Sequence, residues 1–409
     1  MFKAMLENMT QLMETALKEK IRFQPMWYKE WFSLFLKAYE PDSKVIYTSI
    51  YAFPMEILAA FDVVPFDFEL AGALMSTMGQ GVPLMIEAEE RGYSQDMCAF
   101  HRASLGGYFK NYLPRPDLLT TTSYYCDGKG KTNDILSFLW KKESFFLDVP
   151  QEITKDSVRY VEKQLMEAAQ KVGEVAGQRL DMDRLKEAIC SSNRSRGIQL
   201  EILDLLKTRP VPMNPRDMIG YSLHGNLFCG SPVKEMLDKQ LIDEIRDKMA
   251  KGIDRTEKHR IFWFAWLPTY QANVFEILKS RQVSIPLCET FRVFWDEIDE
   301  DKPFEGLALK CLRNPFIGPV GRRTGSMKNV VQGYGIDGAL LFATPACRHS
   351  NSAHMLIKDT FAELDIPFLM LDMDISDPRG YQPEQLKTRL EGFIEVMDGK
   401  SDQRSVNTE

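Results

Sequence analysis

Short apolar runs alternate with helical patterns along the chain, and this alternation occurs in both halves. Most of the runs are nearly continuous in apolar residues, which is typical of parallel strands covered by helices on both faces. Each half is therefore predicted to form an α/β unit around a parallel sheet. The runs are Val45–Ile50, Val63–Phe68, Leu118–Tyr125 and Phe145–Val149 in the first half, and Ile261–Leu267, Val283–Glu289, Gly338–Thr344 and Pro367–Met373 in the second.

A charged region with a helical pattern separates the two units. From about Gln151 to Thr208 it is almost free of Gly and Pro, and the proline-rich stretch Arg209–Pro215 then breaks it before a further helical stretch to Ala250. We predict a helical N-terminal segment at 1–40, a first α/β domain at 41–155, a helical linker region at 156–255, a second α/β domain at 256–398 and a polar, frayed tail at 399–409.

Composition and charge narrow the class of protein. The chain has 409 residues, of which 44% are hydrophobic, and a net charge of −7. No stretch combines Lys and Arg with aromatic residues, so nucleic acid is not an expected partner. No window of about 18 apolar residues occurs, so no membrane span is expected. The first twenty residues mix Lys and Glu with Met and Leu, unlike an export signal, and we expect a cytoplasmic protein.

Several catalytic motifs are absent from the sequence, and one stretch matches a known motif only in part. There is no His-Glu-x-x-His, Gly-x-Ser-x-Gly or Cys-x-x-Cys. Gly130-Lys131-Thr132 resembles the end of a phosphate-binding loop, but Tyr125 replaces a required glycine and Asp127 adds negative charge. We therefore predict a polar strand-to-helix loop and no ATP hydrolysis by this chain.

The seven cysteines divide into two groups by their positions. Cys126 and Cys347 follow predicted strands, at the sheet edge where open α/β proteins bind ligands. Cys98 precedes a predicted helix, whose N-terminus is expected to lower the thiol pKa and favour a metal-binding thiolate. Position alone leaves open whether these three are metal ligands or ordinary buried cysteines. The others are predicted to be core residues: Cys190, Cys229, Cys288 and Cys311.

Six segments in a fixed order provide a family resemblance. They are Phe53–Leu58, Tyr93–Phe100, Pro116–Asp127, Asp337–Arg348, Ile366–Asp372 and Asp377–Glu395. Together they resemble the 2-hydroxyacyl-CoA dehydratases and ATP-dependent benzoyl-CoA reductases, over nearly the whole chain. The second, third and fourth segments contain the cysteines at 98, 126 and 347, in the places where the family carries its cluster cysteines.

The resemblance implies a fold, a cofactor and partners. It implies two flavodoxin-like (Rossmann-like) domains with a [4Fe–4S] cluster held by Cys98, Cys126 and Cys347, the fourth iron position being open or bound by a non-cysteine ligand. It also implies an acyl-CoA substrate, a related second subunit in a heterodimer or homodimer, and a separate ATP-hydrolysing iron–sulfur activator that supplies one electron. The sequence has no phosphate-binding loop, which agrees with ATP hydrolysis by a separate protein.

The implied reaction explains why such an enzyme needs a cluster. One electron added to the thioester carbonyl gives a ketyl radical anion, which expels the neighbouring hydroxyl and makes the β-proton acidic. An iron with an open position can donate the electron and hold the carbonyl oxygen. We therefore expect an iron–sulfur subunit of an enzyme that dehydrates a 2-hydroxyacyl-CoA to a 2-enoyl-CoA.

The resemblance also suggests roles near the substrate. Glu69 corresponds to a family glutamate close to the substrate, so we predict that it handles a proton or binds the leaving hydroxyl, the alternative being a surface acid. Tyr51 replaces a serine of some dehydratases and leaves the acyl group undetermined. His101 and Arg102 are expected either to tune the cluster or to face solvent.

Two arginine-containing pairs have weaker assignments. The adjacent Arg322 and Arg323 are expected to meet CoA phosphates or to lie in a solvated loop. Asp377 and Arg379 are predicted to form a structural turn.

Three other functions stay open at this stage. Arg292–Asp296 with Leu307–Ala308 resembles the smaller subunit type of ring reductases, in which case the chain would relay electrons for aromatic-ring reduction. The second alternative is a cluster-bearing electron carrier without a substrate site. The third is a metal-free α/β binding protein.

Overall fold

Two parallel sheets organise the chain in the computed structural model, which describes residues 1–50, 53–264 and 266–406. The first has the strand order β2-β1-β3-β4 and the second β6-β5-β7-β8. This order is that of flavodoxin-like sheets, so the predicted α/β class with two such units is confirmed. The strands are β1 (Val45–Tyr47), β2 (Val64–Phe66), β3 (Leu118–Thr122), β4 (Ser144–Leu147), β5 (His259–Phe264), β6 (Val283–Cys288), β7 (Gly338–Phe342) and β8 (Phe368–Leu371).

All eight predicted strands are present, but each ends earlier than its apolar run. At β3 the prediction extended to Tyr125, whereas the strand ends at Thr122. The reason is a sharp turn, because Tyr125 adopts a left-handed φ of 73° and Cys126 already caps the next helix. The apolar residues beyond the strand ends lie at the carboxyl edge of the sheet and are not part of its hydrogen-bonded ladder.

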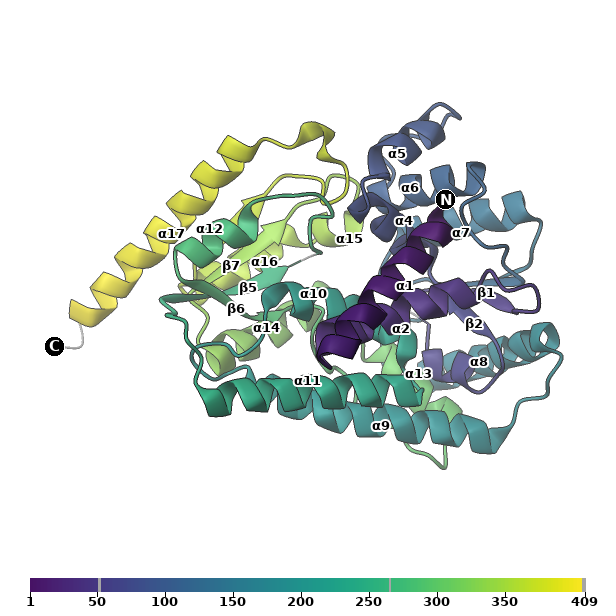
Figure 1. The fold of residues 1–409 in the computed structure, drawn as a ribbon. Helices are drawn as coiled ribbons and strands as arrows, with labels where there is room; N and C mark the ends of the chain where they lie inside the picture. Colours follow the sequence, from purple (N-terminus) through teal and green to yellow (C-terminus); the bar gives the residue numbers. More distant parts are fainter. Residues whose placement is uncertain (51–52, 265, 407–409) are drawn as a thin grey trace.

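Helices cover both sheets and join them (Figure 1). They are α1 (Phe2–Glu19), α2 (Phe23–Lys37), α3 (Met55–Ala59), α4 (Phe68–Thr77), α5 (Gly81–Glu89), α6 (Ala99–Phe109), α7 (Asp127–Trp140), α8 (Lys155–Ala176), α9 (Met182–Leu205), α10 (Pro215–His224), α11 (Pro232–Lys251), α12 (Val274–Ser280), α13 (Pro303–Leu312), α14 (Val320–Tyr334), α15 (Arg348–Asn351), α16 (His354–Glu363) and α17 (Pro383–Val406), with 3-10 turns η1 (Gly225–Phe228) and η2 (Pro378–Gly380).

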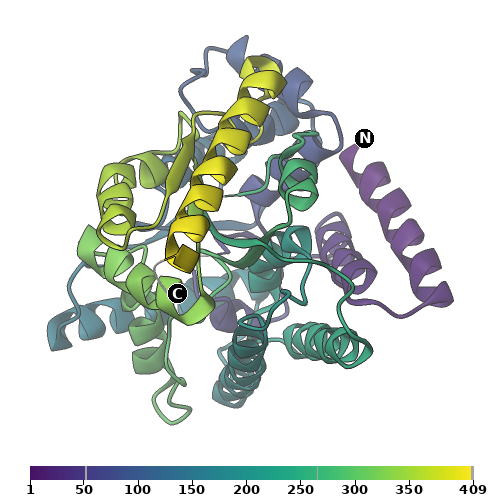
Figure 2. The same cartoon turned by 90° about the vertical axis from the view of Figure 1, so that its left-hand side faces the viewer.

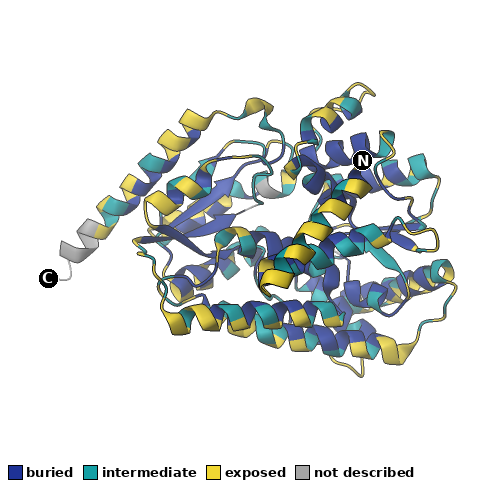
Figure 3. Ribbon diagram, viewed as in Figure 1, coloured by how far each residue is buried: buried dark blue, intermediate teal, exposed yellow. Residues whose placement is uncertain are grey.

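The region between the sheets is helical, as predicted. Asp181 caps α9 by accepting hydrogen bonds from two backbone N–H groups, and α10 begins at Pro215 after the cap residue Asn214. Helices α9 and α11 contact each other along the base of the molecule, and α1 lies on its outside (Figures 1 and 2). Exposed residues follow the outer faces of α1 and α17, while strands β1, β3, β5, β6 and β7 are buried throughout (Figure 3).

The end of the chain differs from the prediction of a frayed tail from 399. Helix α17 continues to Val406, and Lys400 Nζ donates to the backbone oxygen of Asp365 at 2.9 Å. That contact fixes a turn of the helix beyond the predicted boundary. No helix in the described ranges is long and apolar enough to span a membrane.

One helix of the second half lies in the core beneath the first sheet. Helix α13 contacts α8 and α9, and its Leu307 and Leu312 share a buried cluster with Leu147 of β4. The two α/β units therefore share a hydrophobic core, and the predicted domain boundaries stay a prediction.

Candidate metal centre

A cavity of about 600 Å³ lies where the carboxyl ends of the two sheets face each other. Residues that follow β3, β5, β6, β7 and β8 line it, together with the start of α6. In each sheet the connections from the two central strands run in opposite directions. The central strands are β1 and β3 in the first sheet and β5 and β7 in the second. Such folds bind ligands at the carboxyl ends of these two strands. The cavity thus lies at the switch points of two sheets at once.

Three cysteines reach this cavity from three different elements. Cys98 is the cap residue of α6, Cys126 is the cap residue of α7, and Cys347 follows β7. Cys126 Sγ accepts a hydrogen bond from the backbone N–H of Lys129 at 3.3 Å. All three thiols are half-buried. The cysteines singled out in the sequence therefore come together, and their role as ligands stays a prediction.

The thiol pKa values differ from the expectation for a helix N-terminus. Burial raises the pKa of Cys98 well above its usual range, and Glu69, Cys126 and Cys347 raise it further. Burial, Glu69 and Cys347 likewise raise the pKa of Cys126 to about 12. The predicted lowering was wrong because desolvation and neighbouring negative groups outweigh the helix end. A bound cation would supply the positive charge that stabilises the thiolate form of these cysteines.

A buried cluster of charges lies beside the cysteines. Lys129 Nζ donates to Asp67 Oδ2 and to Glu69 Oε2, both at 2.8 Å. Burial would raise the pKa of Glu69, but the charge of Lys129 and its hydrogen bond outweigh burial and keep the pKa low. The same carboxylates overcome burial at Lys129 and raise its pKa. Glu69 is thus an ionised, buried acid and not the surface acid considered above.

His101 is buried against this cluster, with 1% of its surface exposed. Its Nδ1 lies 3.1 Å from Thr132 Oγ1, and its Nε2 lies 3.8 Å from Glu69 Oε1. Burial lowers the pKa of His101, so the imidazole is neutral. The solvent-facing alternative for this residue is wrong.

These side chains make a donor set that fits a metal. A carboxylate oxygen of Glu69, the sulfur of Cys98 and a ring nitrogen of His101 lie within 4.8 Å of one another. Cys126 and Cys347 add two further thiols to the same cavity. Thiolate sulfur and imidazole nitrogen are ligands that iron–sulfur clusters and soft or borderline metals accept. The residues present therefore fit an iron–sulfur cluster.

The second half contributes a buried ion pair to the opposite wall. Arg323 Nε and Nη2 donate to the two carboxylate oxygens of Glu289 at 2.6 and 2.7 Å. Arg322 donates to backbone oxygens of Leu312, Ile317 and Gln151. Both guanidinium groups are thus engaged on helix α14, and the solvated-loop alternative is wrong.

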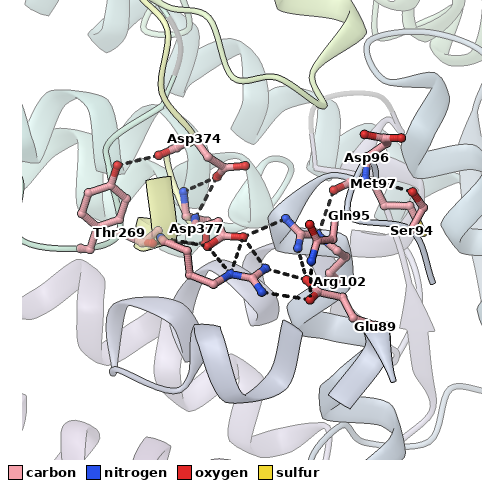
Figure 4. A network of polar contacts seen from close by, with 12 residues as sticks. Glu89, Ser94, Gln95, Asp96, Met97, Arg102, Thr269, Asp374 and Asp377 are labelled. Atoms are coloured by element: carbon pink, nitrogen blue, oxygen red, sulfur yellow. Dashed lines mark hydrogen bonds and ion pairs between the residues drawn. The ribbon is translucent and has the colours of Figure 1, made fainter. Parts of the chain in front are cut away.

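A network of charges joins the two halves at the rim of the cavity (Figure 4). Arg102, one turn after Cys98, pairs with Glu89 of α5 and with Asp377 of the second half, while its Nε donates to the backbone oxygen of Met97 at 3.1 Å. Arg379 donates to Glu89 at 2.6 and 2.9 Å and to Asp377 at 2.6–3.1 Å. Only 3% of the Arg102 side chain is exposed, so it too does not face solvent.

Other predicted positions have simpler outcomes. Asp377 accepts from the backbone N–H of Arg379, which confirms the turn. Gly130–Thr132 lies inside α7 and not in a loop, because the helix starts directly after Cys126. Tyr51 lies outside the described residues. Of the cysteines predicted to be core residues, three are buried, at 229, 288 and 311, and Cys190 is half-buried.

The sequence reasoning missed Lys129 and Asp67. Their positions in the sequence were the available signal. Asp67 directly follows β2, and Lys129 lies in the first turn of α7, the helix that follows β3. Acids and bases at the carboxyl ends of parallel strands meet at the same edge of the sheet.

Comparison with known proteins gives a consistent result. The family model described as 2-hydroxyglutaryl-CoA dehydratase, D-component, matches residues 50–397. The chain is 23% identical to the (R)-phenyllactyl-CoA dehydratase alpha subunit of Clostridium sporogenes, over 86% of this chain and 89% of that protein. It is 24% identical to the B subunit of the benzoyl-CoA reductase of Thauera aromatica, over 90% and 92%. The match over most of its length shows that the chain belongs to the 2-hydroxyglutaryl-CoA dehydratase D-component family.

Proposed function

We propose that this chain, as an enzyme subunit of the dehydratase or reductase type, dehydrates a 2-hydroxyacyl-CoA to a 2-enoyl-CoA. The observation that carries the proposal is the convergence of Cys98, Cys126 and Cys347 on one cavity from both sheets. Three thiols on three elements suit a [4Fe–4S] cluster with one iron position free of cysteine. When bound, the cluster would supply one electron for the thioester carbonyl, giving a ketyl radical anion, and a Lewis-acidic iron.

Glu69 is proposed to handle the proton. Its Oε2 is bound by Lys129, while Oε1 points toward His101 without a hydrogen bond to it. Because Lys129 keeps the carboxylate ionised, Glu69 can accept the β-proton or a hydrogen bond from the departing hydroxyl. Lys129 holds the carboxylate in place while one oxygen stays available.

The cavity wall is proposed to exclude water from the reaction. Apolar side chains from both halves line it, including Phe100, Ile135, Trp266, Phe316 and Ile375. Its volume of about 600 Å³ is in the range of sites for small organic ligands. A radical anion formed there would be shielded from solvent protons.

Partners are proposed from the relatives and from what the sequence lacks. The relatives are alpha or B subunits of enzymes, which supports a related second subunit here. The sequence has no phosphate-binding loop, which supports a separate ATP-hydrolysing iron–sulfur activator as electron source.

Anaerobic purification with metal analysis tests the proposal. We expect about four irons and four sulfides per chain, as in a [4Fe–4S] cluster, and water loss from a 2-hydroxyacyl-CoA once partner and activator are added. Absence of iron and sulfide after anaerobic reconstitution would contradict the proposal and favour a metal-free binding protein.

Aromatic-ring reduction is the second candidate. The match to a benzoyl-CoA reductase subunit covers 90% of the chain, slightly more than the 86% for the phenyllactyl-CoA enzyme. Mass analysis separates the two reactions, because dehydration removes water from the acyl group while ring reduction adds two hydrogens. A cluster-loaded protein that binds no acyl-CoA would instead indicate an electron carrier.

A further inference from the structure

Aromatic side chains from both halves form a continuous wall in the cavity. We call it the aromatic wall, and it consists of Phe100, Tyr125, Trp266, Phe316 and His349. Trp266 lies at its centre, with ring centroids 6.2 Å from Phe100 and 6.4 Å from Tyr125. The rings of Tyr125, Phe316 and His349 contact one another, with centroids 5.1–5.2 Å apart. The first half provides two of the five rings and the second half three.

The rings of the aromatic wall suit contact with one more ring. Three of the pairs meet edge to face, at interplanar angles of 67–80°. Tyr125, Trp266 and Phe316 are only half-buried, and all three line the cavity. Aromatic rings gain free energy from stacked or edge-to-face contact beyond the area that they bury. An aromatic ligand group in the cavity would therefore be bound more tightly than an aliphatic group of similar size.

The aromatic wall begins beside the thiols. Tyr125 directly precedes Cys126, and His349 lies two residues after Cys347. All four residues line the same cavity. A thioester whose carbonyl lies at the thiols therefore has its acyl chain within reach of the wall.

The inner part of the cavity has no positive charge to offer a second carboxylate. Among the described residues that line it, the permanently charged cations are Lys131, Arg323 and Arg348. Arg323 donates to both oxygens of Glu289 and to a backbone oxygen, and its Cζ lies 5.3 Å from the centroid of the Phe316 ring. The side chains of Lys131 and Arg348 are 83% and 76% exposed, so they belong to the mouth of the cavity.

Acidic side chains also disfavour a second carboxylate. Those that line the cavity outnumber its lysines and arginines, and they are Glu69, Asp96, Asp127, Glu289 and Asp374. A carboxylate on the acyl chain would be removed from water without a cation and among like charges, which is costly. Such an arrangement rejects a dicarboxylic acyl group by repulsion as well as by poor fit.

We propose that the aromatic wall binds the acyl group, and that it selects a 2-hydroxyacyl-CoA ending in an aromatic ring over small or dicarboxylic ones. The inference rests on the proposed function and names its substrate class. A terminal ring covers the apolar wall and makes ring contacts with it. A methyl-sized acyl chain leaves the same rings uncovered.

Binding of CoA thioesters to the full chain, purified anaerobically with its cluster, tests the proposal. Without an electron donor the thioesters stay intact, so calorimetry gives a Kd for each. We expect 2-hydroxy-3-phenylpropanoyl-CoA to bind about tenfold or more tighter than 2-hydroxypropanoyl-CoA, and about 100-fold tighter than 2-hydroxypentanedioyl-CoA. Binding of either competitor as tight as that of the phenyl compound would overturn the proposal. So would equal binding of the branched 2-hydroxy-4-methylpentanoyl-CoA.

Variants of the wall locate the selectivity. F316A and W266A are each expected to weaken binding of the phenyl compound about tenfold and that of 2-hydroxypropanoyl-CoA less than twofold. The matched control is F138A, because Phe138 is a phenylalanine of α7 that is 82% exposed; this variant should bind like wild type. Equal weakening of both thioesters by F316A and W266A would contradict the assignment of the wall. The comparison of thioesters on wild type needs no variant to fold.

The failures of the two proposals are distinguishable. Metal analysis of the same preparation reports on the cluster whatever the order of the Kd values. Full iron and sulfide without preference for the phenyl compound would overturn the role of the aromatic wall and leave the proposed function standing. Absence of iron would overturn the proposed function itself.

Discussion

The two halves of the molecule bury a carboxylate at the same topological position, and they bind it differently. Glu69 follows β2 in the first sheet, and Glu289 follows β6, which occupies the same place in the second. Lys129 contacts only Oε2 of Glu69. Arg323 occupies both oxygens of Glu289. Both acids line the same cavity, and a neighbouring cation lowers the pKa of each.

The difference shows that pKa direction does not identify the reactive acid, whereas hydrogen-bond geometry does. A lysine acts as a point charge and leaves one carboxylate oxygen available, while an arginine fork satisfies both. Glu69 is therefore suited to exchange a proton, and Glu289 to brace the wall. The predictions below test this division, from the largest expected effect to the smallest.

The first prediction is that both halves contribute to one metal centre. C347S, in the second half, is expected to lower iron content as much as C98S and C126S, by about tenfold or more, because each removes a thiolate ligand. C190S, at a half-buried position in α9, is the control and should keep its iron. Full iron in C347S would show that the halves do not share the centre. Iron and sulfide assays measure the outcome.

The second prediction separates the two acids by activity. E69Q is expected to lower kcat about 100-fold or more, because the amide cannot take the proton. Its thermal stability should change little, since Lys129 keeps Asp67 at 2.8 Å. E69D is the matched variant that restores the carboxylate. Normal kcat in E69Q would contradict the proton-handling role.

The third prediction concerns stability at the opposite wall. E289Q leaves the buried Arg323 without its charge partner, and we expect the free energy of unfolding to fall by about 3–5 kcal/mol. The double variant E289Q/R323M, which removes both charges, should recover part of that loss. Chemical denaturation measures both, and an unchanged midpoint in E289Q would refute the bracing role.

The fourth prediction tests the rim network that joins the halves. R102Q is expected to lower the free energy of unfolding by about 2 kcal/mol, because charged hydrogen bonds at a buried site are lost. R194Q removes an exposed arginine with two ion pairs of its own and should cost about 0–1 kcal/mol. If R102Q and R194Q lower the free energy of unfolding equally, the rim network does not stabilise the fold more than exposed ion pairs do.

The fifth and smallest effect is a pH dependence at the same rim. Hydrogen bonds from Arg379, ahead of those from Gln95 and Arg102, lower the pKa of Glu89 from 4.5 to about 2. A depressed carboxyl pKa stabilises the fold fully above the unfolded value near 4.5 and loses that contribution as pH falls toward 2. E89Q should therefore show a shallower loss of stability over this window than wild type or E90Q. Denaturation at a series of pH values measures the slope.

The strands could be predicted from the sequence because parallel strands are buried on both faces. Every residue of β3 and β5 is buried, so their apolar runs were visible without any contact information. Placing Cys126 and Cys347 at strand ends required only that result. Its position before a predicted helix singled out Cys98, and the family resemblance added Glu69; the neighbours of both residues are set by the path of α4 and α6.

The charge partners could not be predicted, because they depend on packing between distant segments. Lys129 meets Glu69 across 60 positions of sequence, and Arg102 meets Asp377 across 275. The pKa of Cys98 was predicted in the wrong direction for the same reason, since its burial and its acidic neighbour are tertiary features. Local patterns give elements, whereas the electrostatics of a site come from the assembled fold.

Helix α13 has a consequence for the order of events during synthesis. Its residues 303–312 complete the core under the first sheet, yet they leave the ribosome after about three quarters of the chain has been made. Until α13 has been synthesised, the apolar surface that it covers in the first half stays exposed. Cys347 arrives later still. Loading of the proposed cluster at all three thiols is thus confined to the nearly finished chain. A truncated first half would be a poor substrate for assembly of that cluster and would be expected to bind chaperones.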